Sequence, residues 1–387
     1  MGDRDMRPAE LPVGFRAFHR NAFINYQLNR AHSLGYADPD ELDASARVIR
    51  RLDDCAEVFT ALAERAEAEG RLRNATSHLR VAEFFSPKRS GAGVPIYRRY
   101  RDLFDRAFRD GGAVRHEIPY GGTTLPAYRL RAVGSSSRGT VLLHGGFDSL
   151  IEEFYAIWER IAASGFDVIA FEGPGQGGAR ALGGLTFDHD WEKPVAAVLD
   201  HFAVDRAAIV GISMGGYWAL RAAGREPRID RVVSWPPVYD WLYQLPGPVR
   251  AVARRMFRFR GFMNWSIRVR ARLFPVLRYV IDQTLYLVDG HEPMEVADWF
   301  LGMNAKHLAS DRVTQDVLLL CGEHDAFQPA ILTRRQTEAL TSARSVQVRM
   351  FTAAEHADTH CQMGNLDLAC RVMTGWLRDG RIPAVRA

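Results

Sequence analysis

The sequence predicts an α/β protein in which a parallel sheet, covered by helices on both faces, follows a helical N-terminal domain and is interrupted by a helical insertion. Apolar runs of strand length alternate with helical stretches from residue 139 to residue 235, and the alternation resumes at residue 317. Strands that are apolar throughout are typical of a parallel sheet buried on both faces. The predicted segments are a helical N-terminal domain (1–112), the first part of the core (113–240), a helical cap (241–312) and the second part of the core (313–387).

Length and composition set the broad class. A chain of 387 residues exceeds one typical compact domain, and 47% hydrophobic with 25% charged residues is an ordinary globular composition. The net charge of +4 is only mildly basic and does not indicate nucleic-acid binding. Residues 1–14 are polar, and no stretch of about 18 apolar residues occurs. We therefore expect a cytoplasmic protein with no signal peptide and no membrane partner.

The cysteines carry no pattern of their own. Cys55, Cys321, Cys361 and Cys370 form no CxxC pair and show no metal-type spacing with histidine. Scattered free thiols fit a reducing cytosol better than a secreted disulfide framework. We expect neither a metal site nor a disulfide.

The first 110 residues carry the spacing of helices. Residues 38–41 (DPDE) combine a capping side chain, a proline at the first helical position and an early acidic residue, which predicts a helix start. Three apolar stripes are formed by Phe15, Phe18, Ala22, Phe23 and Tyr26; by Val48, Leu52, Ala56, Phe59 and Leu62; and by Tyr97, Tyr100, Phe104 and Phe108. Most of these aromatic side chains are expected in helix-packing core, and the pattern does not show which of them line a pocket.

Beyond residues 111–112 the spacing becomes strand-like. Residues 116–132 predict two short strands around a turn at Gly121 and Gly122. Further strands are predicted at 139–144, 166–171, 207–210, 232–235, 317–320 and 345–352, and helices at 151–164, 191–202, 215–223, 330–340 and 366–377.

Residues 211–216 (GISMGG) place Ser213 between an apolar strand and a helix. GxSxG alone is a weak pattern, but strand–GxSxG–helix describes the nucleophile elbow of the α/β-hydrolase fold. Glycines two positions before and after the serine prevent collisions with the neighbouring backbone, and the helix N-terminus favours developing negative charge. The sequence therefore predicts Ser213 as a nucleophile. The alternative is a glycine-rich turn with an idle serine.

A serine nucleophile needs a base that is oriented by an acid, and in this fold the chain order is Ser, acid, His. Asp325 follows the predicted strand 317–320 at the place of the acid, with Glu323 as a rival nearer the strand end and His324 as a loop residue. The base is His356 or His360, because both follow the strand 345–352. Spacing alone does not separate these two histidines.

An oxyanion needs backbone amide donors. One candidate is the amide of Met214, directly after the nucleophile, and the other comes from residues 144–148 (HGGFD) after a strand. Phe147 is the preferred second donor, with Gly146 as the next candidate. Residues 172–177 (EGPGQG) lack the Lys-Ser/Thr of a phosphate loop and are interpreted as a turn near the site.

These motifs together resemble one group of enzymes. Residues 144–149 (HGGFDS) with Glu152 and Glu153, and residues 171–177 (FEGPGQG), look like the bacterial 2,6-dihydroxypseudooxynicotine hydrolases and the related fungal yellowish-green polyketide-shortening hydrolases. Residues 211–216 and 360–362 (HCQ) fit the same group, as does the predicted architecture. The resemblance covers nearly the whole chain, with motifs in the core and architecture alone in residues 1–110.

The resemblance implies a triad of Ser213, Asp325 and His360, since the base of this group precedes Cys-Gln. It also implies hydrolysis of a carbon–carbon bond next to a ketone. In the nicotine-degrading enzyme an additional acidic residue downstream of the serine assists catalysis. No glutamate stands at the matching position here, and Asp240 is the nearest acid. Simple ester cleavage needs no such helper, so this departure leaves both reactions open.

The predicted function is a C–C bond hydrolase that acts on an aromatic or polyketide-like ketone, without a metal or organic cofactor. The aromatic residues of the N-terminal domain and the cap suit such a small molecule. One alternative is a carboxylesterase or thioesterase with the same triad. A second alternative is a catalytically silent binding protein on the hydrolase fold.

The predicted cap contains nine arginines between residues 250 and 278. Such a face could dock an acidic partner, for example a carrier protein, or an anionic membrane. A solvated cap face is the favoured interpretation. A homodimer is the default expectation for assembly.

Overall fold

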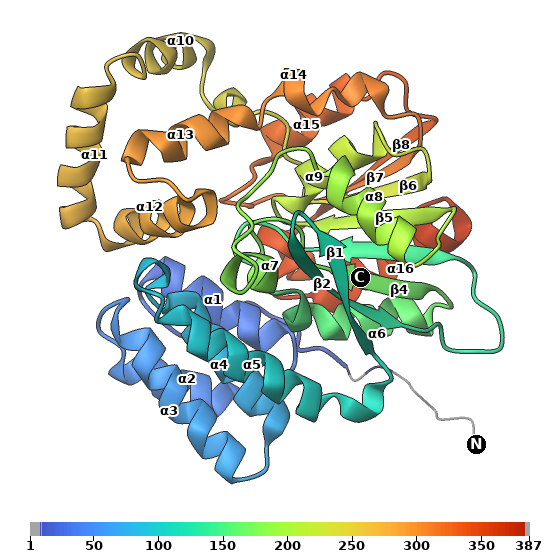
Figure 1. Cartoon of the computed structure of the whole chain (residues 1–387), viewed down its shortest axis with the longest axis horizontal. Helices are drawn as coiled ribbons and strands as arrows, with labels where there is room; N and C mark the ends of the chain where they lie inside the picture. The colour runs from blue at the N-terminus through green and yellow to red at the C-terminus, as the bar shows by residue number, and fades with distance from the viewer. Residues whose placement is uncertain (1–7, 9, 384–387) are drawn as a thin grey trace.

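The computed structural model describes residue 8 and residues 10–383. Residues 1–7, 9 and 384–387 lie outside the described residues, and they include most of the polar N-terminal stretch considered above. Figure 1 shows three parts: a sheet with its covering helices, a group of N-terminal helices and a second helical group that projects beside them. No helix in the described ranges is long and apolar enough to cross a bilayer.

The core is one eight-stranded sheet with the order β1-β2-β4-β3-β5-β6-β7-β8. The strands are β1 (Val114–Tyr120), β2 (Thr123–Leu130), β3 (Thr140–His144), β4 (Asp167–Phe171), β5 (Ala207–Ile212), β6 (Ile229–Trp235), β7 (Asp316–Gly322) and β8 (Ser345–Phe351). Strands β3 to β8 are parallel, as expected. Strands β1 and β2 are antiparallel, and they confirm the two short strands predicted around the turn at Gly121 and Gly122. A two-residue turn with positive φ at Gly121 and Gly122 joins them, and so short a connection permits only an antiparallel pair.

Helices cover both faces of this sheet. Side chains alternate along β3, so that Val141 and Leu143 pack into one apolar cluster and Leu142 into the other. Helices α6 (Tyr155–Ala163) and α16 (Leu366–Asp379) belong to the first cluster, and α8 (Glu192–His201) and α9 (Gly215–Ala223) to the second. Helices α7 (Gly177–Ala181) and α15 (Ala330–Ala339) complete the core.

Five helices precede the sheet: α1 (Ala22–Ser33), α2 (Pro39–Val48), α3 (Asp54–Ala68), α4 (Leu72–Phe85) and α5 (Gly93–Ala107). The predicted start at residue 38 is confirmed, since the Asp38 side chain accepts a hydrogen bond from the Asp40 amide. The first stripe becomes helical only at Ala22, where Asn21 caps the helix. The prediction of one stripe from Val48 to Leu62 is wrong, because the chain is extended at Ile49 and a new helix begins at Asp54.

The second helical group lies between β6 and β7. It contains a short 3-10 helix (Trp241–Gln244) and the helices α10 (Gly247–Met256), α11 (Arg260–Leu273), α12 (Pro275–Val288), α13 (Pro293–Gly302) and α14 (Ala305–Leu308). Tyr279 of α12 packs its ring against Phe84 and Phe85 of α4 and donates a hydrogen bond to the Phe84 carbonyl (2.7 Å). This group, hereafter the cap, therefore meets the N-terminal helices in front of the sheet (Figure 1).

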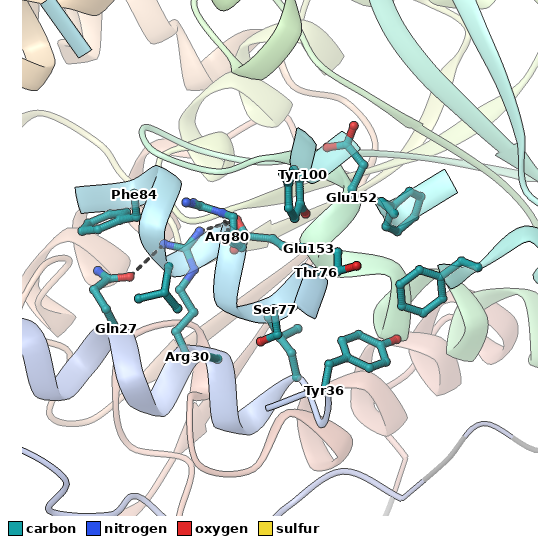
Figure 2. A pocket seen from close by; sticks show the side chains of 15 residues that line it. Gln27, Arg30, Tyr36, Thr76, Ser77, Arg80, Phe84, Tyr100, Glu152 and Glu153 are labelled. Atoms are coloured by element: carbon teal, nitrogen blue, oxygen red, sulfur yellow. Dashed lines mark hydrogen bonds and ion pairs between the residues drawn. The ribbon is translucent and has the colours of Figure 1, made fainter. Parts of the chain in front are cut away.

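A buried cluster of charges joins the N-terminal helices to the loop after β3. Arg30 of α1 donates to Asp148 (3.0 Å) and to Glu153, and Arg80 of α4 donates to the other Glu153 oxygen (3.1 Å). Arg80 also donates to the Asp148 carbonyl (2.5 Å). The side chains of Arg30, Arg80 and Glu153 are at most 9% exposed. Figure 2 shows both guanidinium groups directed at Glu153.

Removal of Glu153 should destabilise the protein strongly. Glu153→Ala leaves two buried guanidinium groups without their shared carboxylate, which should cost about 3–5 kcal/mol of unfolding free energy. Urea-induced unfolding measures this loss. Glu64→Ala is the control, because Glu64 pairs with Arg99 at a site where its side chain is 58% exposed. The control should change stability by less than about 1 kcal/mol. Equal effects of the two substitutions would contradict a structural role for the buried cluster.

Candidate active site

The turn from β5 to α9 holds Ser213 in a left-handed backbone conformation with φ of 59°. Glycines on both sides make this turn sterically feasible. A Cβ atom on Gly211 would lie 2.0 Å from the Gly215 carbonyl oxygen, and one on Gly216 would lie 2.2 Å from that of Pro236. Any larger residue at either position would force the strand and the helix apart. The turn therefore presents the Ser213 side chain at the carboxyl end of the parallel strands, as the GxSxG spacing predicts.

The structure brings Ser213, His360 and Asp325 together. Ser213 Oγ lies 2.9 Å from His360 Nε2, and His360 Nδ1 lies 2.8 Å from Asp325 Oδ2. The other carboxylate oxygen of Asp325 accepts hydrogen bonds from the amides of Phe327 and Gln328 (2.8 Å each). Both oxygens of the buried acid are thus engaged, so the carboxylate cannot turn away from the imidazole.

The electrostatic surroundings of His360 favour its protonated form. Burial by itself lowers the pKa of His360, but the Asp325 carboxylate and the neighbouring Cys361 raise it, and the net pKa lies well above the ordinary value. A carboxylate that stabilises the imidazolium makes the neutral ring a stronger base.

The alternative candidates for the base and the acid do not contact Ser213 or His360. His356 is exposed and sits in the turn after a short 3-10 helix. Glu323 accepts a hydrogen bond from the Ala353 amide (2.7 Å), and His324 pairs with Asp358 (2.9 Å) on the surface. Of the two histidines that spacing could not separate, only His360 contacts Ser213.

The residue after the cysteine of the HCQ tripeptide has a role that the sequence did not reveal. Gln362 is fully buried and accepts a hydrogen bond from the indole nitrogen of Trp235 (2.5 Å). This contact ties the loop that carries His360 to the end of β6. The signal available in the sequence was a glutamine two residues after a catalytic candidate.

The loop after β3 lies against the nucleophile. A Cβ atom on Gly146 would come within 2.7 Å of the Met214 amide nitrogen, so glycine is required for this approach. The Gly146 amide donates to Ser149 Oγ (3.1 Å) and is therefore occupied. The Phe147 amide makes no hydrogen bond to any residue that the structure describes. The two preferred oxyanion donors, Phe147 and Met214, accordingly belong to segments that meet beside Ser213.

Gln328 is an additional neighbour of the Met214 amide. When its carboxamide is oriented so that both ends are hydrogen-bonded, the nitrogen donates to the Pro236 carbonyl (3.2 Å) and the oxygen accepts from Met214 (3.3 Å). A substrate oxygen at this amide would displace that long contact. No motif in the sequence pointed to Gln328.

The EGPGQG turn supports the same loop. Gln176 Nε2 donates to the carbonyls of Gly145 (2.8 Å) and Gly146 (3.0 Å), which fixes the direction of both peptide groups. Glu172 accepts hydrogen bonds from the amides of Ile151 (3.2 Å) and Gly178 (2.5 Å). Burial and the nearby Glu152 raise the pKa of Glu172 well above its ordinary value. The EGPGQG motif is thus a turn near the site, and its Gln176 side chain contacts the loop after β3 directly.

Ser213 and His360 face a cavity of about 230 Å³. Its walls come from α1, the segment after β3, the cap and the loop after β7, together with the segments that carry Ser213 and His360. The aromatic side chains in the wall are those of Phe23, Tyr26, Phe147, Phe154, Trp241, Tyr279, Phe300 and Phe327. The Tyr26 hydroxyl also donates to the His360 carbonyl (3.2 Å). The sequence identified Phe23 and Tyr26 only as members of an apolar stripe.

The acid that reaches this cavity is Asp148 rather than Asp240. Asp240 is buried, accepts a hydrogen bond from the Leu242 amide (2.9 Å) and caps a short 3-10 helix. Asp148 lines the cavity beside Arg30. Burial raises the pKa of Asp148, but the charges of Arg30 and Arg80 outweigh it and hold this pKa below its ordinary value. Asp148 is therefore a carboxylate, paired with Arg30.

Metal ligands do not cluster in the described part of the chain, where no group of three or more histidine, cysteine or acidic side chains could hold an ion.

Comparison with known proteins identifies alpha/beta hydrolases as relatives of this chain. The sequence profile described as alpha/beta hydrolase fold matches residues 141–358. Hydrolase acrC of Aspergillus aculeatus is 32% identical over 269 residues, which cover 59% of this chain and 61% of that protein. The alpha/beta hydrolase psoB of Aspergillus fumigatus is 33% identical over 240 residues, or 53% of this chain and 52% of that protein. The chain thus spans little more than half the length of these relatives.

A solved structure of 2,6-dihydroxy-pseudo-oxynicotine hydrolase covers 90% of this chain and 95% of its own, with a TM-score of 0.63 and 21% identity. At this identity the likeness concerns the fold. Together with the fungal relatives, it confirms the resemblance to this group that the motifs predict.

Gly216→Ala tests the close approach at the turn. The added methyl group would collide with the Pro236 backbone, so we expect a loss of about 1–3 kcal/mol in unfolding free energy and a displaced Ser213. Thermal unfolding of the variant measures the loss. Gly247→Ala at the start of α10 is the matched control, because a Cβ atom there meets no other atom within 4 Å. If Gly216→Ala were as stable as this control, the turn would be looser than described.

Proposed function

Because the chain belongs to the alpha/beta hydrolase fold family, we propose that this enzyme is a serine hydrolase in which Ser213 forms an acyl-enzyme by attack on a substrate carbonyl. The observation that carries the proposal is the unbroken chain of contacts from Ser213 Oγ through His360 to the buried Asp325, at the wall of an apolar cavity. Nucleophile, base and orienting acid in hydrogen-bond reach are what acyl transfer by serine requires.

Each catalytic group has a defined task in this mechanism. His360 Nε2 accepts the Ser213 proton as Oγ attacks the carbonyl carbon, and Asp325 stabilises the imidazolium that forms. The amides of Met214 and Phe147 donate to the resulting oxyanion. The imidazolium then protonates the leaving group, and water, deprotonated by His360, hydrolyses the acyl-enzyme.

The proposed reaction breaks a carbon–carbon bond, and the leaving group is then an enolate. When the C–C bond of a β-diketone breaks, the ketone part would leave as an enolate, which the His360 imidazolium protonates at carbon or oxygen, and the acyl part would remain on Ser213. An aromatic-walled cavity suits an aromatic or polyketide-like ketone. The resemblance to the 2,6-dihydroxypseudooxynicotine hydrolase group also favours carbon–carbon cleavage. We therefore propose a C–C bond hydrolase.

A carboxylesterase or thioesterase is the second candidate, and the orientation of Asp240 favours it. The Asp240 carboxylate is turned to backbone amides and does not line the cavity. Among the described residues downstream of Ser213, no acid other than the His360 partner Asp325 is therefore placed to assist a carbon leaving group. An alkoxide or thiolate would leave without such help.

Product analysis separates these two functions. Purified enzyme is incubated with aryl β-diketones and with aryl esters, and the products are identified by mass spectrometry beside Ser213→Ala. We expect wild type alone to split the diketones into a carboxylic acid and a ketone, with a loss of at least about 10³-fold in the variant. Turnover of esters alone would assign the esterase function. Turnover of neither substrate, without labelling of Ser213 by a fluorophosphonate, would contradict a serine hydrolase.

The pH dependence of kcat/KM tests the role of Asp325. His360 must be neutral to accept a proton, so activity should fall as the pH falls through the His360 pKa of the free enzyme. Because the Asp325 charge raises that pKa, Asp325→Asn should move the acidic limb to lower pH. The same variant should reduce kcat by about 10⁴-fold.

Asp358→Asn is the control for this experiment, since Asp358 lies in the loop that carries His360 but pairs with His324. Its profile should match wild type. An acidic limb in Asp325→Asn that stays in place or moves to higher pH would contradict the proposed pair.

A further inference from the structure

The outer edge of the cap carries an apolar stripe that faces solvent. Val249, Val252 and Met256 of α10 and Phe262, Trp265, Val269 and Leu273 of α11 recur at helical spacing, and all are exposed. Phe259, between the two helices, and Phe274, after them, are exposed as well. Trp265 is 60% exposed and Leu273 is 70% exposed, although large apolar side chains normally pack inward.

This outward face is distinct from the face of α11 that packs within the cap. Met263 is buried, and Ile267 and Ala271 pack against the apolar cluster of α12 and α13. Phe262 and Trp265 instead contact each other, with ring centroids 5.9 Å apart. Figure 1 places α10 and α11 on the side of the cap that is farthest from the sheet. The fold therefore leaves an apolar face of each of these two helices uncovered.

Arginines accompany the stripe, and no acidic residue occurs from residue 241 to residue 281. By helical spacing, Arg270 and Arg272 lie on either side of the stripe on α11. Arg260, Arg268 and Arg278 pair with acids from other segments. Arg254, Arg255, Arg258, Arg270 and Arg272 have no ion-pair partner within the described residues. The uncovered surface thus combines bulky apolar groups with unneutralised positive charge.

This combination restricts what could cover the surface. A second copy of the chain would set the same positively charged patch against itself across a two-fold axis, because such an interface uses one surface patch on both subunits. An anionic bilayer complements the arginines and accepts the apolar side chains at any position, since a fluid surface needs no matching groove. A basic helix with tryptophan, phenylalanine and leucine on its other face is typical of helices that lie in the membrane interface.

We propose that α10 and α11 bind the surface of an anionic lipid bilayer, with the stripe inserted among the acyl chains and the flanking arginines at the lipid phosphates. The inference differs from the solvated face that the arginine count alone favoured, because the structure shows that the arginines surround exposed aromatic rings. It does not depend on the reaction assigned to Ser213.

Co-sedimentation with vesicles tests the proposal. The full-length protein is mixed with large unilamellar vesicles of phosphatidylcholine containing about a third phosphatidylglycerol, or of phosphatidylcholine alone. We expect binding to the anionic vesicles at least about tenfold stronger than to the neutral ones, and weaker at high salt. Phe262→Ala with Trp265→Ala, and separately Arg270→Glu with Arg272→Glu, should each weaken binding to anionic vesicles by about tenfold or more.

The matched control is Arg47→Glu with Val48→Ala, an exposed arginine and an exposed valine on α2. This variant should bind as wild type does, and circular dichroism should show all variants folded. Absence of binding to anionic vesicles would overturn the proposal, as would equal binding to neutral ones. A dimer that dissociates in Phe262→Ala with Trp265→Ala would assign the surface to a second copy. Binding to an immobilised acidic carrier protein without vesicle binding would assign it to a protein partner.

Discussion

Two buried guanidinium groups determine how this molecule is assembled around its site. Arg30 and Arg80 come from the N-terminal helices, and both depend on Glu153 and Asp148, which belong to the loop after β3. A buried charge without a partner is far more costly than a misplaced apolar side chain, so α1 and α4 have one acceptable position on the core. That position brings Phe23 and Tyr26 to the cavity and holds the loop of Gly146 and Phe147 against the turn at Ser213. The same ion cluster thus fixes the cavity wall and the loop proposed to bind the oxyanion.

The proposed catalytic groups and the cavity walls come from separate parts of the chain. Ser213, Asp325 and His360 follow β5, β7 and β8, so the parallel sheet sets their relative positions. The walls come in large part from α1 and the cap, and the two meet where Tyr279 packs on Phe84. Substitutions in these helices can therefore change the shape of the cavity without moving the groups that react. This division explains how a single sheet architecture serves many substrates.

Features that depend on neighbouring residues could be predicted from the sequence, whereas features that depend on contacts between distant residues could not. The turn at Ser213 depends on glycines within three residues of it, and the helix start at Asp38 on its immediate neighbours, so both could be identified. The choice between His360 and His356 depended on a contact between residues 147 positions apart, and only the resemblance to a known group favoured His360.

The acid at the cavity could not be predicted either. Asp240 was considered because it is the nearest acid along the chain. Asp148 reaches the cavity through its ion pair with Arg30, which joins residues 118 positions apart. The break between Val48 and Asp54 was missed because helical spacing continued through it by coincidence.

The hydrogen bond from the Tyr26 hydroxyl to the His360 carbonyl joins residues 334 positions apart. The loop after β8 is synthesised more than 300 residues after α1, so this contact forms only when both segments have been made. Pairings between residues so distant in sequence are slow to form in folding. A chain that stops short of β8 lacks both His360 and this partner of the Tyr26 hydroxyl. The contacts among Ser213, His360 and Asp325 and the attachment of Tyr26 to the core therefore depend on the same segment.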